Sequence, residues 1–233
     1  KARRFSEAPV QGFTGRRQPA ILRQRKAVVC VRTGIYGGTF NPIHLAHVHL
    51  VRAFIERLSL DRVLLIPTGQ PPHKAAQALA GNAERLAMCR LAAAEITECP
   101  VEVSDIEMRR GGKSYTADTL AQLRAQYPAD DFYLLMGEDM FLTVERWYRP
   151  EEIFRLATIC AAPRDYGSFR RLIRHGEAVR GMYPAFGFIL QNIPYLPVSS
   201  TEVRARLRSG GPLQDLLPQR VADYIEARGL YRA

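Results

Sequence analysis

The chain has 233 residues, of which 47% are hydrophobic, and a formal net charge of +10 at pH 7. This length and apolar content suit one α/β domain with a substantial core, and they exclude a disordered polymer. No stretch approaches the roughly 20 unbroken apolar residues of a membrane helix, and four cysteines without a Cys-x-x-Cys spacing favour reduced thiols, so we expect a soluble, cytoplasmic protein.

The positive charge is concentrated at the beginning of the chain. Residues 1–33 hold nine of the 33 basic residues and one of the 23 acidic residues, so the remaining 200 residues are nearly neutral. A nucleic-acid-binding protein is expected to spread its cations over a folded face. We therefore expect residues 1–32 to be a non-catalytic extension and residues 33–233 to form the functional domain. A nucleic-acid-binding protein that uses the basic segment is the remote alternative.

Beyond this segment, apolar stretches alternate between strand-like and helix-like patterns. The expected strands cover residues 33–38, 62–66, 101–103, 132–136, 158–162 and 188–190. The expected helices cover residues 44–58, 82–96, 116–127, 138–147, 200–208 and 218–228. This alternation predicts a single Rossmann-like α/β domain, in which helices cover both faces of a mostly parallel sheet and further helices follow at the C-terminus.

Several residues are expected to mark helix ends. Pro42 and Pro218 suit the first turn of a helix because proline has no N–H to satisfy and a fixed φ. Asn82 is expected to cap the N-terminus of its helix, and either Ser200 or Thr201 is expected to cap a later one. Gly229 is expected at the end of the last helix.

The run Gly-Gly-Thr-Phe-Asn-Pro-Ile-His-Leu-Ala-His at residues 37–47 follows the first expected strand. Two glycines allow a tight turn close to a ligand, and the N-terminus of the following helix favours an anion. His44 and His47 are three residues apart and share one helical face, so both can approach one phosphate chain. The run therefore predicts a nucleotide phosphate site. Packed or solvated histidines and a zinc site are the alternatives, although no cysteine or third histidine at a matching spacing is nearby.

The same run resembles the signature of the nucleotidyltransferase superfamily that transfers AMP or CMP to a phosphate, Gly-Gly-[Thr/Ser]-Phe-Asp-Pro-x-His-x-Gly-His. Asn41 replaces the commoner Asp, and Ala46 replaces the second-to-last Gly. Because an amide cannot accept a proton as a general base, position 41 is not expected to act as one.

Two later loops resemble those of the bacterial nicotinate-mononucleotide adenylyltransferases. Pro67–Lys74 matches their Pro-Pro-His-Lys loop, in which Lys74 would face a phosphate, and Ser114–Leu120 matches their Ser-Tyr-Thr-x-Asp-Thr-Leu block. The N–H groups at the start of the helix in that block can hold the carboxylate of nicotinate. The preceding Gly-Gly-Lys-Ser at residues 111–114 ends like a P-loop, but the glycine that a P-loop requires is replaced by Glu107.

Two further blocks complete the resemblance, which covers about Gly34 to Tyr231. Gly137-Glu138-Asp139 follows an expected strand and precedes Trp147-Tyr148, although a lone tryptophan is more often a packing residue. Pro197–Arg204 is similar to the family's Ile-Ser-Ser-Thr-x-x-Arg motif, whose hydroxyls, helix N–H groups and guanidinium would converge on the β- and γ-phosphates. An ordinary capped helix with an exposed arginine is the alternative.

The resemblance implies a nucleotidyltransferase domain at residues 33–233 that transfers AMP from ATP to nicotinate mononucleotide, giving deamido-NAD and pyrophosphate in NAD biosynthesis. Mg²⁺ is expected with ATP, and no protein ligand to it is assigned. The acceptor phosphate has a second pKa near 6, so it is largely a dianion at neutral pH and needs no general base. The alternatives are sister transferases that use nicotinamide mononucleotide, phosphopantetheine or glycerol phosphate.

The implied site residues fall into three groups. The catalytic residues would be His44, His47 and Arg204. The ATP-binding residues would be Gly37, Gly38, Thr39, Phe40, Gly137, Asp139, Ser200 and Thr201. The residues that bind nicotinate mononucleotide would be Asn41, Lys74, Tyr115, Thr116, Trp147 and Tyr148. Apart from these two substrates, neither nucleic acid nor a membrane is an expected partner, and a homo-oligomer is left open.

Overall fold

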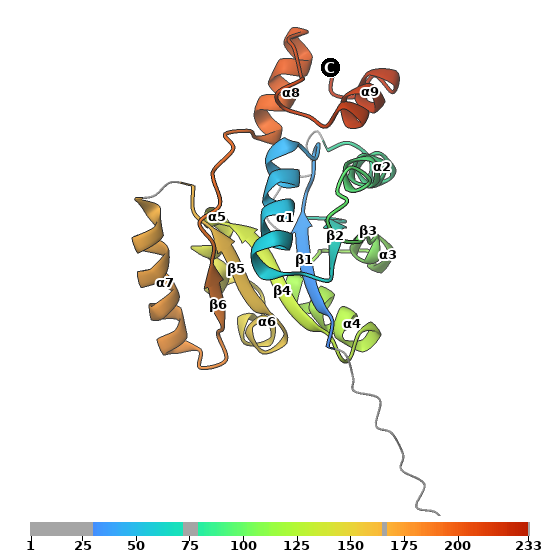
Figure 1. The fold of residues 1–233 in the computed structure, drawn as a ribbon. Helices are drawn as coiled ribbons and strands as arrows, with labels where there is room; N and C mark the ends of the chain where they lie inside the picture. Colours follow the sequence, from blue (N-terminus) through green and yellow to red (C-terminus); the bar gives the residue numbers. More distant parts are fainter. Residues whose placement is uncertain (1–29, 72–78, 165–166, 233) are drawn as a thin grey trace, which may run out of the picture.

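The computed structural model describes residues 30–71, 79–164 and 167–232 (Figure 1). The six strands in these residues form one sheet in the order β3-β2-β1-β4-β5-β6, and every neighbouring pair is parallel. Their bounds are β1 Arg32–Gly38, β2 Arg62–Pro67, β3 Val101–Val103, β4 Asp131–Gly137, β5 Thr158–Ala162 and β6 Phe188–Leu190. This is the strand order of a doubly wound Rossmann-like sheet, and it confirms the predicted fold.

Helices cover both faces of the sheet (Figure 1). One hydrophobic core lies under α1, α2, α8 and α9, and the other lies under α3 to α7. The described helices are α1 Leu45–Leu58, α2 Asn82–Ala93, α3 Ile106–Arg110, α4 Thr116–Gln126, α5 Glu138–Phe141, α6 Pro150–Leu156, α7 Ser168–Met182, α8 Ser200–Ser209 and α9 Gln219–Ala227, with a 3₁₀ turn at Val144–Arg146.

The central strands supply both cores because successive side chains point to opposite faces of a sheet. In β2, Leu64 and Ile66 belong to the core under α3 to α7, whereas Leu65 belongs to the core under α1. These buried strands read as continuous apolar runs, as expected for a parallel sheet covered on both sides. Within the described residues, no helix has the length and apolar character needed to cross a membrane.

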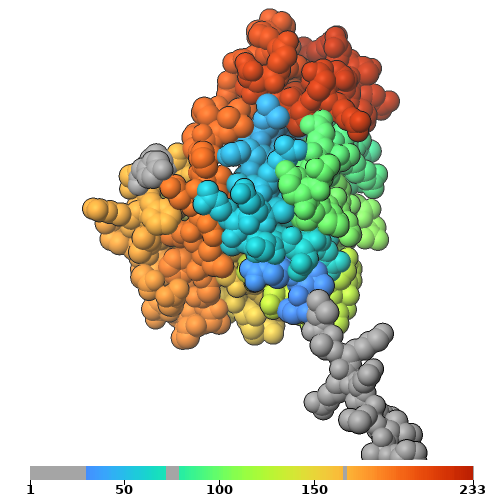
Figure 2. Space-filling model, viewed as in Figure 1, coloured from blue at the N-terminus to red at the C-terminus, as the bar shows by residue number. Residues whose placement is uncertain are grey.

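The C-terminal helices α8 and α9 lie together at one end of the molecule, next to α1 and α2 (Figure 2). The amide N–H of Leu45 donates to the carbonyl oxygen of Leu216, which joins the start of α1 to the segment before α9. The C-terminal segment therefore packs beside the beginning of the first helix, where the sequence predicts a phosphate site.

The expected helix at 138–147 is wrong as one element. It consists of α5, a turn and the 3₁₀ segment. At the break, the hydroxyl of Thr143 donates to the carbonyl oxygens of Asp139 and Met140, and such local bonds compete with helix continuation. Helices α3, α6 and α7 were not expected. The buried stripe of α7 is sparse and includes Gly176, against which the ring of Phe188 packs too closely for a larger side chain.

Three expected helix starts are also wrong. Pro42 lies in the turn before α1, after a cis peptide bond, and His44 occupies the N-cap. Asn82 is the first residue of α2, which Gly81 precedes as N-cap. Ser199 caps α8 by accepting from the amide of Glu202 at 3.2 Å. In each of the three cases, the helix begins one to three residues away from the predicted point.

The last helix ends and begins close to the prediction. Pro218 is the N-cap of α9 rather than a first-turn residue. Gly229 follows the helix with a φ of 60°, a left-handed conformation that favours glycine. The division of the chain at residues 32 and 33 stays a prediction, because residues 1–29 lie outside the described residues.

Candidate active site

A cavity of about 640 Å³ opens at the carboxyl ends of β1, β4 and β5. Its volume is in the range of small-molecule sites, and its position between β1 and β4 is the switch point at which Rossmann-like sheets bind ligands. The loop after β1, the first turns of α1, the start of α5, the end of β5 and the segment leading into α8 all contribute to its lining.

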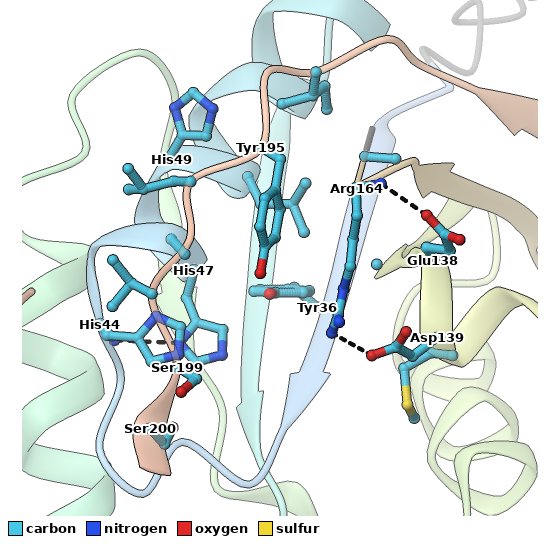
Figure 3. Close-up of a pocket in the computed structure, with 18 of the residues that line it drawn as sticks. Tyr36, His44, His47, His49, Glu138, Asp139, Arg164, Tyr195, Ser199 and Ser200 are labelled. Carbon is cyan, nitrogen blue, oxygen red and sulfur yellow. Dashed lines mark hydrogen bonds and ion pairs between the residues drawn. The ribbon is translucent and has the colours of Figure 1, made fainter. Parts of the chain in front are cut away.

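Two stacked imidazoles form one wall of this cavity (Figure 3). The rings of His44 and His47 lie 3.6 Å apart between centroids, at an interplanar angle of 26°. The backbone N–H of His44 donates to Nδ1 of His47 at 3.2 Å, so a neutral His47 carries its proton on Nε2. Nδ1 of His44 is buried and has no hydrogen-bond partner among the described residues.

Both imidazoles are neutral in the free protein at physiological pH. Burial lowers the pKa of His44 to about 4. Burial, and secondarily the neighbouring His44, lowers the pKa of His47 well below its ordinary value. The two rings therefore present N–H donors rather than fixed positive charges, and any charge on them must be induced by an anion bound alongside.

Phe40 supports the imidazoles from behind instead of lining the cavity. Its side chain is buried, and its ring meets the ring of His47 edge-on at 5.0 Å between centroids. A Cβ on Gly38 would come within 2.8 Å of the Phe40 ring, so this ring requires glycine at position 38. Neither Gly37 nor Gly38 lines the cavity, whereas Thr39 does.

The N-terminus of α8 lies beside the two imidazoles (Figure 3). The hydroxyl of Ser200 donates to the carbonyl oxygen of Pro42 at 2.9 Å. The guanidinium of Arg204 donates to the backbone oxygen of Asn41 at 2.7 Å and to the hydroxyl of Thr201 at 3.3 Å. Residues 200, 201 and 204 all line the cavity, so two segments about 160 positions apart in the sequence meet on one wall.

Asn41 is buried at the edge of the cavity and joins three segments. Its Oδ1 accepts from the amide of Ala80 at 3.0 Å and from the hydroxyl of Tyr231 at 2.8 Å. A carboxylate oxygen could accept the same two bonds. The amide at this position therefore preserves the architecture that an aspartate would support.

Acidic and basic side chains form the opposite wall (Figure 3). Glu138, at 2% exposure, accepts from the amide of Arg164 at 2.8 Å and pairs with the guanidinium of Arg171. The guanidinium of Arg164 pairs with Asp139, which lines the cavity together with Gly137.

Sequence reasoning missed several of the lining residues. Glu138 stands between two residues that the motif singled out, and Arg164 follows a strand that ends at the same edge of the sheet, so both carried a positional signal. Tyr36 and Tyr195 lie between the two walls, and nothing in the local sequence marks Tyr195 as part of the site (Figure 3).

The predicted acceptor residues form a second group away from this cavity. Tyr115, Thr116, Trp147 and Tyr148 are absent from its lining. The rings of Tyr115 and Tyr148 contact each other at 4.4 Å between centroids. The indole N–H of Trp147 donates to the hydroxyl of Thr143 at 3.4 Å. Of the predicted acceptor residues, only Asn41 lines the cavity, and Lys74 lies outside the described residues.

The loop before α4 braces the loop after β2. The hydroxyl oxygen of Ser114 accepts from the amides of Gly69 and Gln70 at 3.1 and 3.2 Å, and Lys113 pairs with Gln70 in a β-bridge. The Gly-Gly-Lys-Ser segment is thus a loop anchor, and α4 begins only at Thr116. Across the described parts of the chain, no three histidine, cysteine, aspartate or glutamate side chains come together as a metal cluster.

Comparison with known proteins identifies relatives over most of the chain. The family model described as cytidylyltransferase-like matches residues 35–206. A probable nicotinate-nucleotide adenylyltransferase of Dehalococcoides mccartyi is 38% identical over 206 residues, which cover 88% of this chain and 98% of the relative. A protein of the same description from Synechococcus is 39% identical over 201 residues, which cover 86% and 94% of the two chains.

Solved structures share the fold. Nicotinic acid mononucleotide adenylyltransferase of Plasmodium falciparum, complexed with NaAD, aligns with a TM-score of 0.69 at 22% identity over 86% of this chain and 97% of the other. A putative nicotinate-nucleotide adenylyltransferase from Vibrio parahaemolyticus aligns with a TM-score of 0.59.

Proposed function

This chain belongs to the nicotinate-nucleotide adenylyltransferases within the cytidylyltransferase-like group. From this family we infer that the protein transfers AMP from ATP to nicotinate mononucleotide, giving deamido-NAD and pyrophosphate. The structure supports this function through one wall of the cavity, where two neutral imidazoles, the start of α8 and Arg204 converge. Such a wall offers directed N–H donors to a chain of phosphates.

In the reaction, an oxygen of the acceptor's phosphate attacks the α-phosphorus of ATP, and the bond from that phosphorus to the departing pyrophosphate breaks. The attacking phosphate is already a dianion at neutral pH, so no proton has to be removed from it. The protein's task is to hold two anions in line and to stabilise the charge that moves onto the pyrophosphate.

We propose that Nε2–H of His47 donates to the α-phosphate, because the tautomer set by the amide of His44 leaves that proton available. The ring of His44, which also lines the cavity, would supply a second polar contact. Arg204, Ser200 and Thr201 would bind the β- and γ-phosphates. Arg204 would exchange its bond to the oxygen of Asn41 for a charge-assisted bond to phosphate.

On the opposite wall, we propose that Gly137 and Asp139 contact the adenosine, in keeping with their place in the lining. The backbone of Gly37 to Thr39 would turn beneath the phosphates, and Phe40 would act by supporting His47.

For the acceptor, the proposal rests on the aromatic group and on α4. Tyr148 is 50% exposed and could stack on the pyridine ring together with Trp147. The N-terminus of α4, at Thr116, could receive the nicotinate carboxylate, with Tyr115 beside it. Asn41 would contribute through its place in the cavity lining, and Lys74 remains a proposed phosphate contact.

Divalent metal accompanies ATP in this family, and we propose Mg²⁺ bound mainly by phosphate oxygens and water, as part of the substrate. We also propose that residues 33–233 are sufficient for catalysis, that residues 1–32 are dispensable, and that no nucleic acid takes part. The free thiols of all four cysteines support a cytoplasmic location.

The test compares kcat/KM for nicotinate mononucleotide and for nicotinamide mononucleotide in the presence of Mg²⁺ and ATP. The release of pyrophosphate measures the rate. Phosphopantetheine and glycerol phosphate serve as the other acceptors. A preference for nicotinamide mononucleotide or for either of these compounds would contradict the proposed substrate. Deletion of residues 1–32 should leave turnover intact, whereas loss of turnover would favour a role for the basic segment.

A further inference from the structure

Arg85 is a buried cation that lies outside the cavity and takes no part in the proposed chemistry. It stands in the first turn of α2, and its side chain is fully buried. Among the described residues, the hydrogen bonds of its guanidinium go to neutral backbone and amide oxygens and not to a carboxylate. Burying a cation is costly, so a position that needed only to fill the core would be better served by an apolar side chain.

The hydrogen bonds of Arg85 gather three separate segments of the chain. Its Nη1 donates to the carbonyl oxygen of Thr39 at 2.8 Å. Its Nη2 and Nε donate to the carbonyl oxygens of Gly69 and Ala80, both at 3.3 Å. A fourth bond, from Nη2 to Oδ1 of Asn82 at 2.6 Å, fixes the guanidinium on its own helix. The planar fork of arginine can satisfy four acceptors in fixed directions, which a lysine ammonium cannot reproduce.

These segments carry part of the cavity wall. Thr39, Asn41 and Leu79 all line the cavity. Ala80 is held on both sides of its backbone, because Arg85 binds its carbonyl oxygen and Asn41 binds its amide N–H. A shift of the guanidinium would therefore move Ala80 and, through it, the side chain of Asn41.

We propose that Arg85 is a positioning residue for adenylyl transfer: it fixes the loop at residues 39–41 against Gly69 and Ala80, and so sets the position of Asn41, the predicted acceptor residue that lines the cavity. The effect of Arg85 on KM for nicotinate mononucleotide rests on the proposed function. The geometric consequence, an ordered Ala80 amide, does not depend on it.

The kinetic experiment compares Arg85→Lys with Met88→Ala, a fully buried residue of the same helix whose side chain belongs to the core. We expect Arg85→Lys to raise KM for nicotinate mononucleotide about tenfold, while kcat and KM for ATP change less than about threefold. Met88→Ala should lower Tm without changing either KM. The proposal is overturned if KM is unchanged in folded Arg85→Lys, or if Met88→Ala raises it equally.

A second variant covers the case in which Arg85→Lys does not fold. Asn82 is exposed, and Asn82→Ala removes only one acceptor from the guanidinium. We expect a rise in the same KM of about threefold. An unchanged KM in folded Asn82→Ala, when Arg85→Lys cannot be measured, would count against the proposal.

Hydrogen exchange separates this inference from the proposed function. If the unmodified protein forms no product from ATP and nicotinate mononucleotide, the proposed function fails, and the exchange of the Ala80 amide then decides the role of Arg85. We expect that amide to exchange about tenfold faster in Arg85→Lys, with no change in Met88→Ala. Equal exchange in Arg85→Lys and the unmodified protein would refute the positioning role.

Discussion

The proposed phosphate wall and the proposed acceptor group, called the aromatic group below, differ in what holds their side chains in place. The phosphate wall comprises His44, His47 and the start of α8, whose groups are held by stacking and by hydrogen bonds to the loop after β1. The aromatic group comprises Tyr115, Trp147 and Tyr148, and two of its rings contact each other. Charge stabilisation needs donors fixed in advance, whereas stacking tolerates rings that separate as a ligand enters.

The largest loss of activity is expected from a substitution in the phosphate wall, at His47. Replacement by alanine removes the donor with the fixed tautomer, and we expect kcat to fall by about 10²–10³-fold with the fold retained. Pyrophosphate release measures the rate, and circular dichroism checks the fold. His49→Ala is the matched control, because this histidine also lines the cavity but bonds the carbonyl oxygen of Pro194. Near-normal kcat in His47→Ala would show that the wall is not the catalytic centre.

The burial of His44 in this wall predicts that the free energy of unfolding depends on pH. The pKa of His44 is about 4 in the folded protein, below the ordinary value of 6.5, so the unfolded chain binds more protons between these values. Stability should therefore be complete above pH 6.5 and be lost as the pH falls towards 4, by up to about 3 kcal/mol from His44.

Urea unfolding at pH 7.5, 6 and 5 measures this slope. His44→Asn should reduce this slope, because the variant lacks the imidazole at position 44, while His47, whose pKa is also lowered by burial, keeps its own share. An identical slope in the variant and the unmodified protein would mean that other groups produce the pH dependence.

A smaller effect is expected in the aromatic group. Tyr148→Ala should raise KM for nicotinate mononucleotide about tenfold, since stacking on one aromatic side chain is worth about 1–3 kcal/mol. KM for ATP should not change. Met182→Ala, a change at an exposed apolar side chain on α7, is the control. If Tyr148→Ala instead raised KM for ATP, the assignment of this group to the acceptor would be wrong.

The smallest effect is expected at Asn41, whose side chain joins the loop after β1 to Ala80 and Tyr231. Asn41→Asp keeps an oxygen that can accept from Ala80 and Tyr231, so kcat should stay within about threefold of the unmodified enzyme. Steady-state kinetics at pH 7.5 provides the measurement. A large gain in kcat would indicate that the reaction uses a general base after all.

Much of the scaffold could be predicted from local patterns. The apolar runs of β2, β4 and β5 are continuous because both faces of a parallel sheet are buried, and they alternate with helical stretches along the chain. The motif at residues 37–47 likewise marked the end of the first strand, although Gly37 and Gly38 lie in β1 itself and the turn follows at residues 41–42. These features depend on residues close together in sequence, so the sequence by itself determined them.

The tertiary structure decided what local patterns cannot express. The low pKa of His44, the meeting of Ser200 with Pro42 and the burial of Arg85 under three carbonyl groups depend on segments tens of residues or more apart. The close packing of Phe188 against Gly176 of α7 likewise exists only in the folded chain. Periodicity records which face of an element is apolar, but burial and hydrogen-bond partners exist only after the elements have packed.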